Sequence, residues 1–218
     1  HTPGVLVDST ADLTLALMLA VTRRVAEADR WIRAGHWTDG WQSDLLLGTD
    51  ISQATIGIVG LGPIGEAVVT RLKGFGCRVL TWNRTPKQVA GTEPVALDAL
   101  FAQSDIVSLH TALTEETTHI ANRARLASMP SGSSLINTGR GLLVDEAALI
   151  DEVQSGRLMA GLDVFVNEPL PVDHPFKRLN NVVMLPHLGS ATASTRDAMV
   201  ARALDNLHAG MAGQRVPF

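Results

Sequence analysis

The chain has 218 residues, of which 45% are hydrophobic and 18% charged, an ordinary globular composition with room for one large domain or two small ones. A formal net charge of −4, with Lys and Arg scattered along the chain, argues against nucleic-acid binding, and no apolar stretch reaches the ~20 residues of a membrane span. The single cysteine, Cys77, excludes an internal disulfide and a cysteine-rich metal site, so we expect a soluble, cytoplasmic protein without a metal, a nucleic-acid partner or membrane contact.

Residues 8–34 have the apolar spacing of one long helix, which Ser9 or Thr10 would cap. Because the first half of this helix is apolar around much of its circumference, we expect it to lie deep in a core or against another subunit. The loop that follows carries Trp37 and Trp41. These two rings would either anchor an interface or cover the local core.

A glycine-rich turn follows residues 55–59, an apolar segment that is typical of a buried strand. The turn has the pattern G-x-G-x-x-G, formed by Gly60, Gly62 and Gly65. The first glycine permits a tight turn, the second lets backbone N–H groups approach a pyrophosphate, and the third lets the next helix pack close to the strand. Glycine triplets also occur in ordinary turns, but residues 66–82 continue as a helix and a second strand. This βαβ context predicts a dinucleotide site.

Asn83, Arg84 and Thr85 stand at the end of that second strand, where an acidic residue about 20 positions after the glycines normally binds an unmodified ribose. An acidic residue would repel a 2′-phosphate, whereas Arg84 would pair with it through charge-assisted hydrogen bonds. The sequence therefore favours NADP over NAD as the cofactor. The alternative interpretation is that Arg84 is a solvated loop charge.

Strands and helices continue to alternate along the rest of the chain. This alternation, with short buried strands, predicts an α/β fold with a doubly wound parallel sheet of the Rossmann type. Ligands of such sheets bind at the carboxyl ends of the strands, so polar residues at those ends are candidate site residues. The predicted strands are residues 105–109, 133–137, 159–164 and 181–185, and the predicted helices are residues 99–103 and 145–155.

Arg140, Glu168 and His187 each follow one of these predicted strands. A reductase of a 2-keto acid needs a cation for the substrate oxygens, a proton donor for the nascent alkoxide, and an acid group that keeps the donor charged and oriented. Arg140, His187 and Glu168 match these three roles. Each of them alone has an ordinary structural interpretation, as a loop charge, a turn or a satisfied polar group. Their joint occurrence in this fold predicts an active site.

Four segments, taken in order and spacing, resemble the D-isomer-specific 2-hydroxyacid dehydrogenases: residues 60–65, 137–141, 161–170 and 185–192. The resemblance covers essentially the whole chain and looks closest to the branch of glyoxylate/hydroxypyruvate reductases and 2-ketogluconate reductases. It implies NADPH-dependent hydride transfer to a small 2-keto acid, which yields a D-2-hydroxyacid. In this reaction Arg140 would hold the substrate, Glu168 would support His187, and His187 would donate the proton.

The resemblance also implies a set of cofactor contacts and a quaternary structure. The long helix and the loop of Trp37 and Trp41 would form a homodimer interface. His110, His119 and His174 match no catalytic position and are interpreted as structural or surface residues. The implied cofactor contacts are Pro63 and Ile64 at the pyrophosphate, Arg84 and Thr85 at the 2′-phosphate, the segment His110, Thr111 and Ala112 flanking the cofactor, Thr138 and Asp163 at the nicotinamide, Gly189 next to it, and Thr10 as a weaker candidate.

Members of the resembled family carry a second, flavodoxin-like substrate domain before the long helix, and we expect this domain to be missing from the 218 residues. We expect residues 1–190 to form the NAD(P)-binding domain and residues 191–218 a C-terminal helix that would return toward the missing domain. Without that domain the substrate would be neither clamped nor shielded from water. The 218 residues alone are therefore expected to bind NADP but to show little turnover.

Two other functions remain open on the sequence. A formate dehydrogenase of the same superfamily would carry Gln in place of Glu168, so Glu168 argues against that enzyme. A corepressor-like protein that senses NAD(P) would keep the fold and use cofactor occupancy to control association. The set of Arg140, Glu168 and His187 weighs against a purely sensory role. The sequence does not separate glyoxylate, hydroxypyruvate and 2-ketogluconate as substrates.

Overall fold

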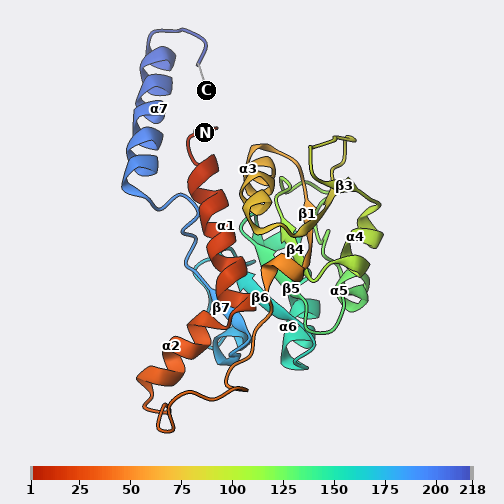
Figure 1. Ribbon diagram of the computed structural model, residues 1–218. Coiled ribbons are helices and arrows are strands. Elements are labelled where there is room, and N and C mark those ends of the chain that lie inside the picture. The colour runs from red at the N-terminus through yellow and green to blue at the C-terminus, as the bar shows by residue number, and fades with distance from the viewer. Residues whose placement is uncertain (1, 217–218) are drawn as a thin grey trace.

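Seven parallel strands form one sheet, in the order β3-β2-β1-β4-β5-β6-β7, in the computed structural model, which describes residues 2–216 (Figure 1). The chain runs outward from β1 to β3, returns to β4 beside β1 and continues outward to β7, so the predicted doubly wound α/β fold is confirmed. The ends of the predicted segments 1–190 and 191–218, namely residues 1 and 217–218, lie outside the described residues. The strands are β1 (Thr55–Val59), β2 (Arg78–Trp82), β3 (Glu93–Pro94), β4 (Ile106–Leu109), β5 (Ser134–Asn137), β6 (Met159–Leu162) and β7 (Val182–Met184).

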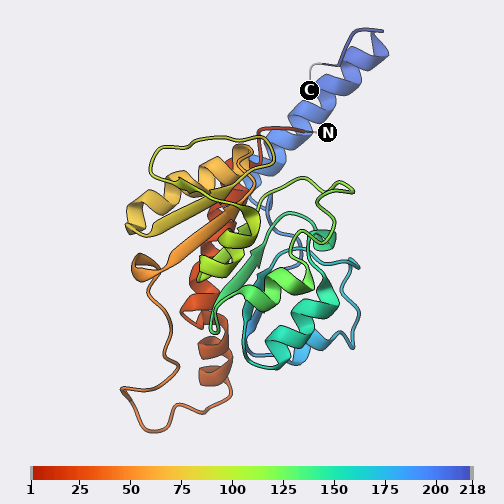
Figure 2. The same cartoon turned by 90° about the vertical axis from the view of Figure 1, so that its right-hand side faces the viewer.

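Helices cover both faces of the sheet, as expected for a parallel sheet whose strands are apolar on both sides (Figures 1 and 2). On one face lie α1 (Val7–Thr22) and α3 (Pro63–Leu72); on the other lie α4 (Leu97–Gln103), α5 (Arg123–Ser128) and α6 (Glu146–Gln154). Short 3-10 turns connect them: η1 (Ile51–Gln53), η2 (Lys73–Phe75), η3 (Gly141–Leu143) and η4 (Pro175–Arg178).

The central strand β1 shows how the two helix layers pack against the sheet. Ile56 and Ile58 are fully buried among the side chains of α1 and α3. Gly57 points to the other face, where an added Cβ would lie 2.4 Å from Cδ2 of Leu100 in α4. A larger residue there would push α4 off the sheet, because packed interiors leave no space for extra atoms.

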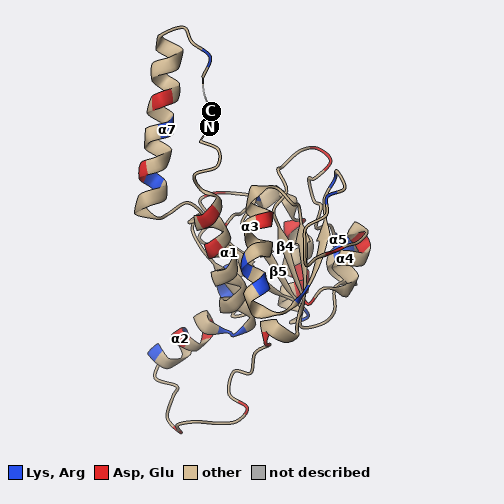
Figure 3. Cartoon of the chain, turned by 45° about the horizontal axis from the view of Figure 1, so that its top comes forward, with Lys and Arg blue, Asp and Glu red and all other residues tan. Residues whose placement is uncertain are grey.

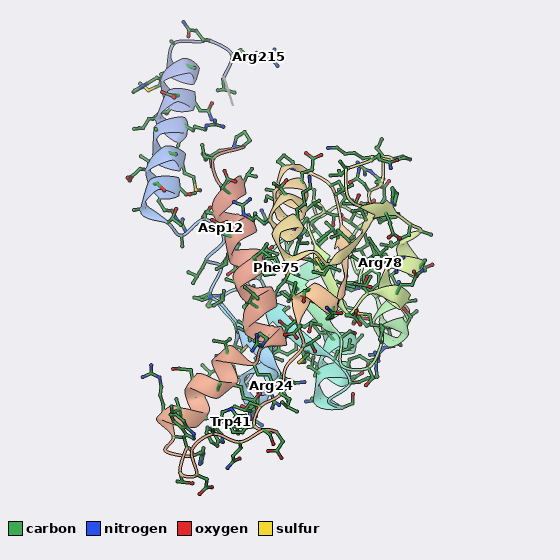
Figure 4. All side chains as sticks on the ribbon, viewed as in Figure 1. Asp12, Arg24, Trp41, Phe75, Arg78 and Arg215 are labelled. Carbon is green, nitrogen blue, oxygen red and sulfur yellow. The ribbon has the colours of Figure 1, made fainter. Side chains whose placement is uncertain are left out.

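The prediction of one helix over residues 8–34 is wrong, because the helix breaks after Thr22. Arg24 has the left-handed backbone conformation, with φ of 53°, and α2 (Val25–Arg33) leaves in a new direction (Figure 4). The Arg24 guanidinium makes two hydrogen bonds of 2.8 Å with Glu27 in the first turn of α2. Apolar residues continue through this break from α1 into α2, so the sequence pattern does not mark it.

The predicted cap of the first helix is also wrong. α1 begins at Val7, with Leu6 at the N-cap position and no side-chain cap. Ser9 Oγ instead donates to the Leu6 carbonyl at 3.1 Å, and the hydroxyl of Thr10 is turned into the core. The reason is that Thr10 has a tertiary partner, the carbonyl of Gly189.

Two segments project from the sheet-bearing body. One is an arm, formed by α2 and residues 34–50, which extends away from the sheet; Trp41 lies on its loop (Figures 1 and 4). The other is α7 (Ala193–Met211), which Thr192 caps and which buries only Thr195 (Figure 2). None of the helices among residues 2–216 is long and apolar enough to cross a bilayer. Lys and Arg are dispersed along the ribbon (Figure 3).

Candidate active site

The glycine turn between β1 and α3 is held by close backbone contacts. Gly60 has φ of +101°, and a Cβ on it would lie 2.8 Å from the backbone of His110 and Thr111. A Cβ on Gly65 would lie 2.1 Å from the Gly60 carbonyl oxygen. Gly62, by contrast, is the N-cap of α3 and has nothing within 4 Å of an added Cβ, so its backbone faces open space at the positive end of the helix. This turn fits an incoming phosphate group.

Two polar residues after β2 have different roles: Asn83 holds the glycine turn, and Arg84 reaches across the cleft. Asn83 Oδ1 accepts the Leu61 N–H at 2.9 Å, and its Nδ2 donates to the Thr85 carbonyl at 2.7 Å. Arg84 is exposed, and its Nη1 lies 2.7 Å from Glu116 Oε2 in the loop after β4. Asn83 thus fastens the glycine turn to the end of β2, and Arg84 is available at the surface.

A cleft of about 220 Å³ opens between the glycine turn, the end of β2 and the loop after β4. Two buried polar atoms in its wall, Nδ1 of His110 and Oγ1 of Thr111, have no hydrogen-bond partner among the described residues. Such orphaned atoms indicate a place for a polar ligand or for ordered water. The lining residues are Gly60, Gly62, Trp82, Asn83, Arg84, Thr85, His110, Thr111, Ala112, Thr114 and Thr117.

His110 is half-buried in this cleft wall, with its Nδ1 atom buried and its Nε2 2.8 Å from Ser108 Oγ. Burial lowers the pKa of the His110 imidazole to about 4, so the ring is neutral near neutral pH. The resemblance gives His110 no catalytic role but implies that residues 110–112 flank the cofactor, and the structure places these residues in the lining of the cleft. His110 directly follows a fully buried strand, at the edge where ligands bind.

His187 and Glu168 meet at the ends of β6 and β7. His187 Nδ1 lies 2.8 Å from Glu168 Oε2, while Glu168 Oε1 accepts the Phe165 N–H at 3.0 Å. Burial raises the pKa of the Glu168 carboxyl, but the hydrogen bonds from His187 and Phe165 and the nearby charge of Arg140 outweigh it, so the pKa lies below its usual value. Glu168 is therefore a carboxylate that orients the imidazole.

Asp163 holds the backbone of the loop that carries His187. Its buried carboxylate accepts the N–H groups of Leu188 at 2.6 Å and Gly189 at 2.8 Å, and its carbonyl accepts the His187 N–H at 3.0 Å. His187 itself has φ of 55°. Burial raises the pKa of Asp163 above its usual value, although the two N–H groups act in the opposite direction. Both carboxylate oxygens of Asp163 are thus engaged by the backbone of residues 188–189.

Arg140 is exposed on the loop after β5, with Nη1 donating to the Gly139 carbonyl at 2.7 Å. Asn137 shapes this loop: its side chain accepts the Gly139 N–H at 3.0 Å and donates to the Arg140 carbonyl at 2.9 Å. The next residue, Gly141, abuts the loop that leads to Glu168, since an added Cβ would lie 2.0 Å from the Phe165 carbonyl carbon. The loops of Arg140 and Glu168 are therefore in direct contact.

A buried chain of hydroxyl groups ties α1 to the same strand ends. Thr10 Oγ1 donates to the Gly189 carbonyl at 3.1 Å, and Thr14 Oγ1 donates to the Thr10 carbonyl at 2.8 Å. Because the Thr14 proton is used in this way, Thr138 donates to Thr14 across 2.9 Å. Three of the predicted cofactor residues, Thr10, Thr138 and Gly189, lie together here, and both threonine hydroxyls have partners within the protein.

The predicted residues therefore fall into two neighbouring groups along one sheet edge. The glycine turn, with Pro63 and Ile64 in the first turn of α3, and residues 83–85 and 110–112 lie at the ends of β1, β2 and β4. Arg140, Asp163, Glu168 and His187 lie at the ends of β5, β6 and β7. No group of His, Cys, Asp and Glu within residues 2–216 has the geometry of a metal site. This arrangement defines a dinucleotide-binding α/β domain with a hydrogen-bonded pair, His187 and Glu168, at the neighbouring strand ends.

Comparisons with known proteins show the family. Residues 15–189 match the family described as D-isomer specific 2-hydroxyacid dehydrogenase, NAD binding domain. The glyoxylate reductase of Korarchaeum cryptofilum is 44% identical over 222 residues, which include all of this chain and 67% of that protein. The glyoxylate/hydroxypyruvate reductase B of Pectobacterium carotovorum is 48% identical, over 98% of this chain and 68% of that protein. The chain belongs to the D-isomer specific 2-hydroxyacid dehydrogenases, a family of oxidoreductases, as the sequence predicts.

Solved structures agree with this family. The TT0316 protein from Thermus thermophilus superposes with a TM-score of 0.95 at 49% identity, over the whole of this chain and 69% of that one. An acyclic imino acid reductase in complex with NADPH and D-Arg superposes with a TM-score of 0.88 at 30% identity, over 99% of this chain and 68% of that one. The chain thus spans about two thirds of the length of its relatives.

Proposed function

We propose that the protein takes part in the NADPH-dependent reduction of a small 2-keto acid, such as glyoxylate, hydroxypyruvate or 2-ketogluconate, to the D-2-hydroxyacid. The observation that carries this proposal is the His187–Glu168 pair, 2.8 Å apart at the sheet edge that holds the glycine turn. The names of the relatives, glyoxylate reductase and glyoxylate/hydroxypyruvate reductase B, support the substrate class.

Glu168, His187 and Arg140 have different roles in the proposed reduction. When bound, the reduced nicotinamide supplies the hydride that adds to the keto carbon. Glu168, a carboxylate, accepts the Nδ1–H of His187, which leaves the opposite nitrogen, Nε2, to donate a proton to the alkoxide oxygen. The Arg140 guanidinium attracts the substrate carboxylate and ketone oxygen. Reduction thus consumes one hydride and one proton, and the proton comes from His187.

The cofactor is assigned to the cleft between β1, β2 and β4. The open N-terminus of α3 at Gly62 suits the pyrophosphate, and the unpartnered atoms of His110 and Thr111 suit polar groups of the dinucleotide. Arg84, exposed at the rim, suits a 2′-phosphate, which favours NADPH over NADH. The solved reductase in complex with NADPH shows that a relative at 30% identity binds this form.

Two measurements test the proposal. Titration with NADPH and NADH, for the wild type and Arg84→Asp, reports on the cofactor. We expect NADPH to bind more tightly in the wild type and to lose this advantage in Arg84→Asp. NADPH oxidation with each of the three keto acids reports on the reaction; it is followed at high protein concentration, because the 218 residues alone are expected to show little turnover. His187→Gln should abolish turnover without changing NADPH affinity, and unchanged turnover in this variant would contradict the assigned role.

A further inference from the structure

The side chains of Arg84 and Glu116 form a bridge across the mouth of the cofactor cleft. Arg84 follows β2, Glu116 lies in the loop after β4, and β1 runs between these two strands. The 2.7 Å ion pair therefore joins the two loops that flank the glycine turn. Both side chains are largely exposed, at 69% and 71% of their surface, so either can turn toward a ligand.

The loop that carries Glu116 is held firmly against the cleft. Thr117 Oγ1 donates to the Ala112 carbonyl at 2.7 Å and accepts the Thr114 N–H at 2.7 Å. Thr114 and Thr117 both line the cleft, and Glu116 lies between them in the chain. The carboxylate of Glu116 therefore stays at the cleft rim even when its ion pair with Arg84 is broken.

Lys87, another cation at this end of the cleft, is occupied elsewhere. Its Nζ lies 2.6 Å from Glu66 Oε1 and donates to the Leu61 carbonyl at 3.1 Å. These contacts fasten Lys87 to the glycine turn and to the first turn of α3. Arg84 differs from Lys87, because its ionic partner within residues 2–216 is Glu116 at the mouth of the cleft. An anion that enters the cleft and binds Arg84 therefore has to compete with Glu116.

We propose that Glu116 sets the coenzyme preference of this protein by competing with the 2′-phosphate of the cofactor for Arg84. This inference rests on the proposed function, in which NADPH occupies the cleft. A 2′-phosphate has to displace the Glu116 carboxylate from the guanidinium, so binding of NADPH is opposed. NADH carries no phosphate there and leaves the bridge intact. Glu116 therefore reduces the preference for NADPH that Arg84 provides.

The test compares the binding of NADPH and NADH in matched variants. Energy transfer from Trp82, which lines the cleft, to the reduced nicotinamide gives the readout; calorimetry gives an independent one. Glu116→Gln removes the competing charge, and Glu115→Gln removes the same charge one residue away, on an exposed side chain. Exposed ion pairs are weak, so we expect Glu116→Gln to raise the affinity for NADPH about two- to fivefold. The affinity for NADH and both affinities of Glu115→Gln should stay close to wild type.

A second pair of variants separates competition from simple repulsion. In the Arg84→Gln background the gain from Glu116→Gln should disappear, because no guanidinium is left to compete for. A gain that persists there, or that is equal for NADH and for Glu115→Gln, would overturn the proposal. A wild type that prefers NADH, with no response to Arg84→Asp, would instead refute the proposed use of NADPH. A wild type that prefers NADPH but shows no gain in Glu116→Gln would refute only the role of Glu116.

Discussion

His110 shows, at the scale of a single residue, how a buried polar side chain both shapes the cleft and costs stability in acid. The residue is half-buried, its Nε2 is hydrogen-bonded to Ser108, and its buried Nδ1 has no partner among the described residues. A charged ring at this position would lack compensating groups, which is why its pKa falls to about 4. In the unfolded chain the pKa of His110 is near 6.5, so between about pH 4 and 6.5 the ring is protonated in the unfolded chain and neutral in the folded one.

The free energy of unfolding should therefore decrease as the pH falls from about 6.5 to about 4. For a shift of this size His110 contributes a loss of up to about 3 kcal/mol. Urea unfolding at several pH values, for the wild type and His110→Gln, isolates this contribution from that of the carboxylates. The wild type should lose more stability toward acid than the variant, and parallel curves for the two proteins would show that His110 is not the cause.

At the scale of elements, the loops after β5, β6 and β7 act as one unit because their backbones are in contact. Gly141 permits the loop of Arg140 to lie on residues 165–166, which lead to Glu168. Asp163 and the hydroxyl chain of α1 hold the loop of His187 from the other side. Catalytic geometry of this kind depends on such supporting contacts as much as on the reacting side chains.

Gly141→Ala should disturb this unit, since the added Cβ would lie 2.0–2.4 Å from the backbone of residues 165–166. We expect a loss of about 1–3 kcal/mol in the free energy of unfolding. The imidazole resonances of His187, followed by NMR, should shift because Glu168 moves. Gly74→Ala is the matched control: nothing lies within 4 Å of its added Cβ. Equal effects of the two substitutions would exclude the contact between the loops as the cause.

The arm is an element without a core of its own. None of the residues of α2 is buried, and Trp41 is 86% exposed. We propose that a second copy of the chain covers this arm, as the resemblance to the family implies. Trp37→Ser with Trp41→Ser should then lower the mass measured by sedimentation velocity from a dimer to a monomer. The cofactor cleft lies on a different part of the molecule, so NADPH affinity should be retained. A wild type that sediments as a monomer would contradict the proposal.

For the whole molecule, cofactor binding and folding should be coupled, because the cleft is built from the ends of three strands and from the loops between them. A ligand that binds only the folded state stabilises it by about 2.7 kcal/mol at 100 times its dissociation constant. NADPH at that excess should raise the urea midpoint of the wild type. At the same concentration it should raise the midpoint of Arg84→Asp less. Equal shifts in the two proteins would mean that Arg84 does not bind the 2′-phosphate.

Much of the fold was accessible from the sequence because its signals are local. Glycine spacing and apolar runs depend on neighbours a few residues away, and they predict the αβ alternation that the structure confirms. Two short elements gave no such signal. β3 has two residues, one of them Pro94, and α5 has six, so neither shows a period.

The sequence by itself determined the family, the class of fold and the positions of Arg140, Glu168 and His187 after successive strands, since each depends on order and spacing along the chain. The resemblance also implied the pairing of Glu168 with His187, but only the tertiary structure decided the other contacts. It broke the first helix at Arg24, turned Thr10 toward Gly189, engaged Asp163 with the backbone beside His187, and brought Glu116 to Arg84 from a separate loop. These pairings join residues that are distant in sequence, and no local pattern encodes which distant partner a polar group will meet.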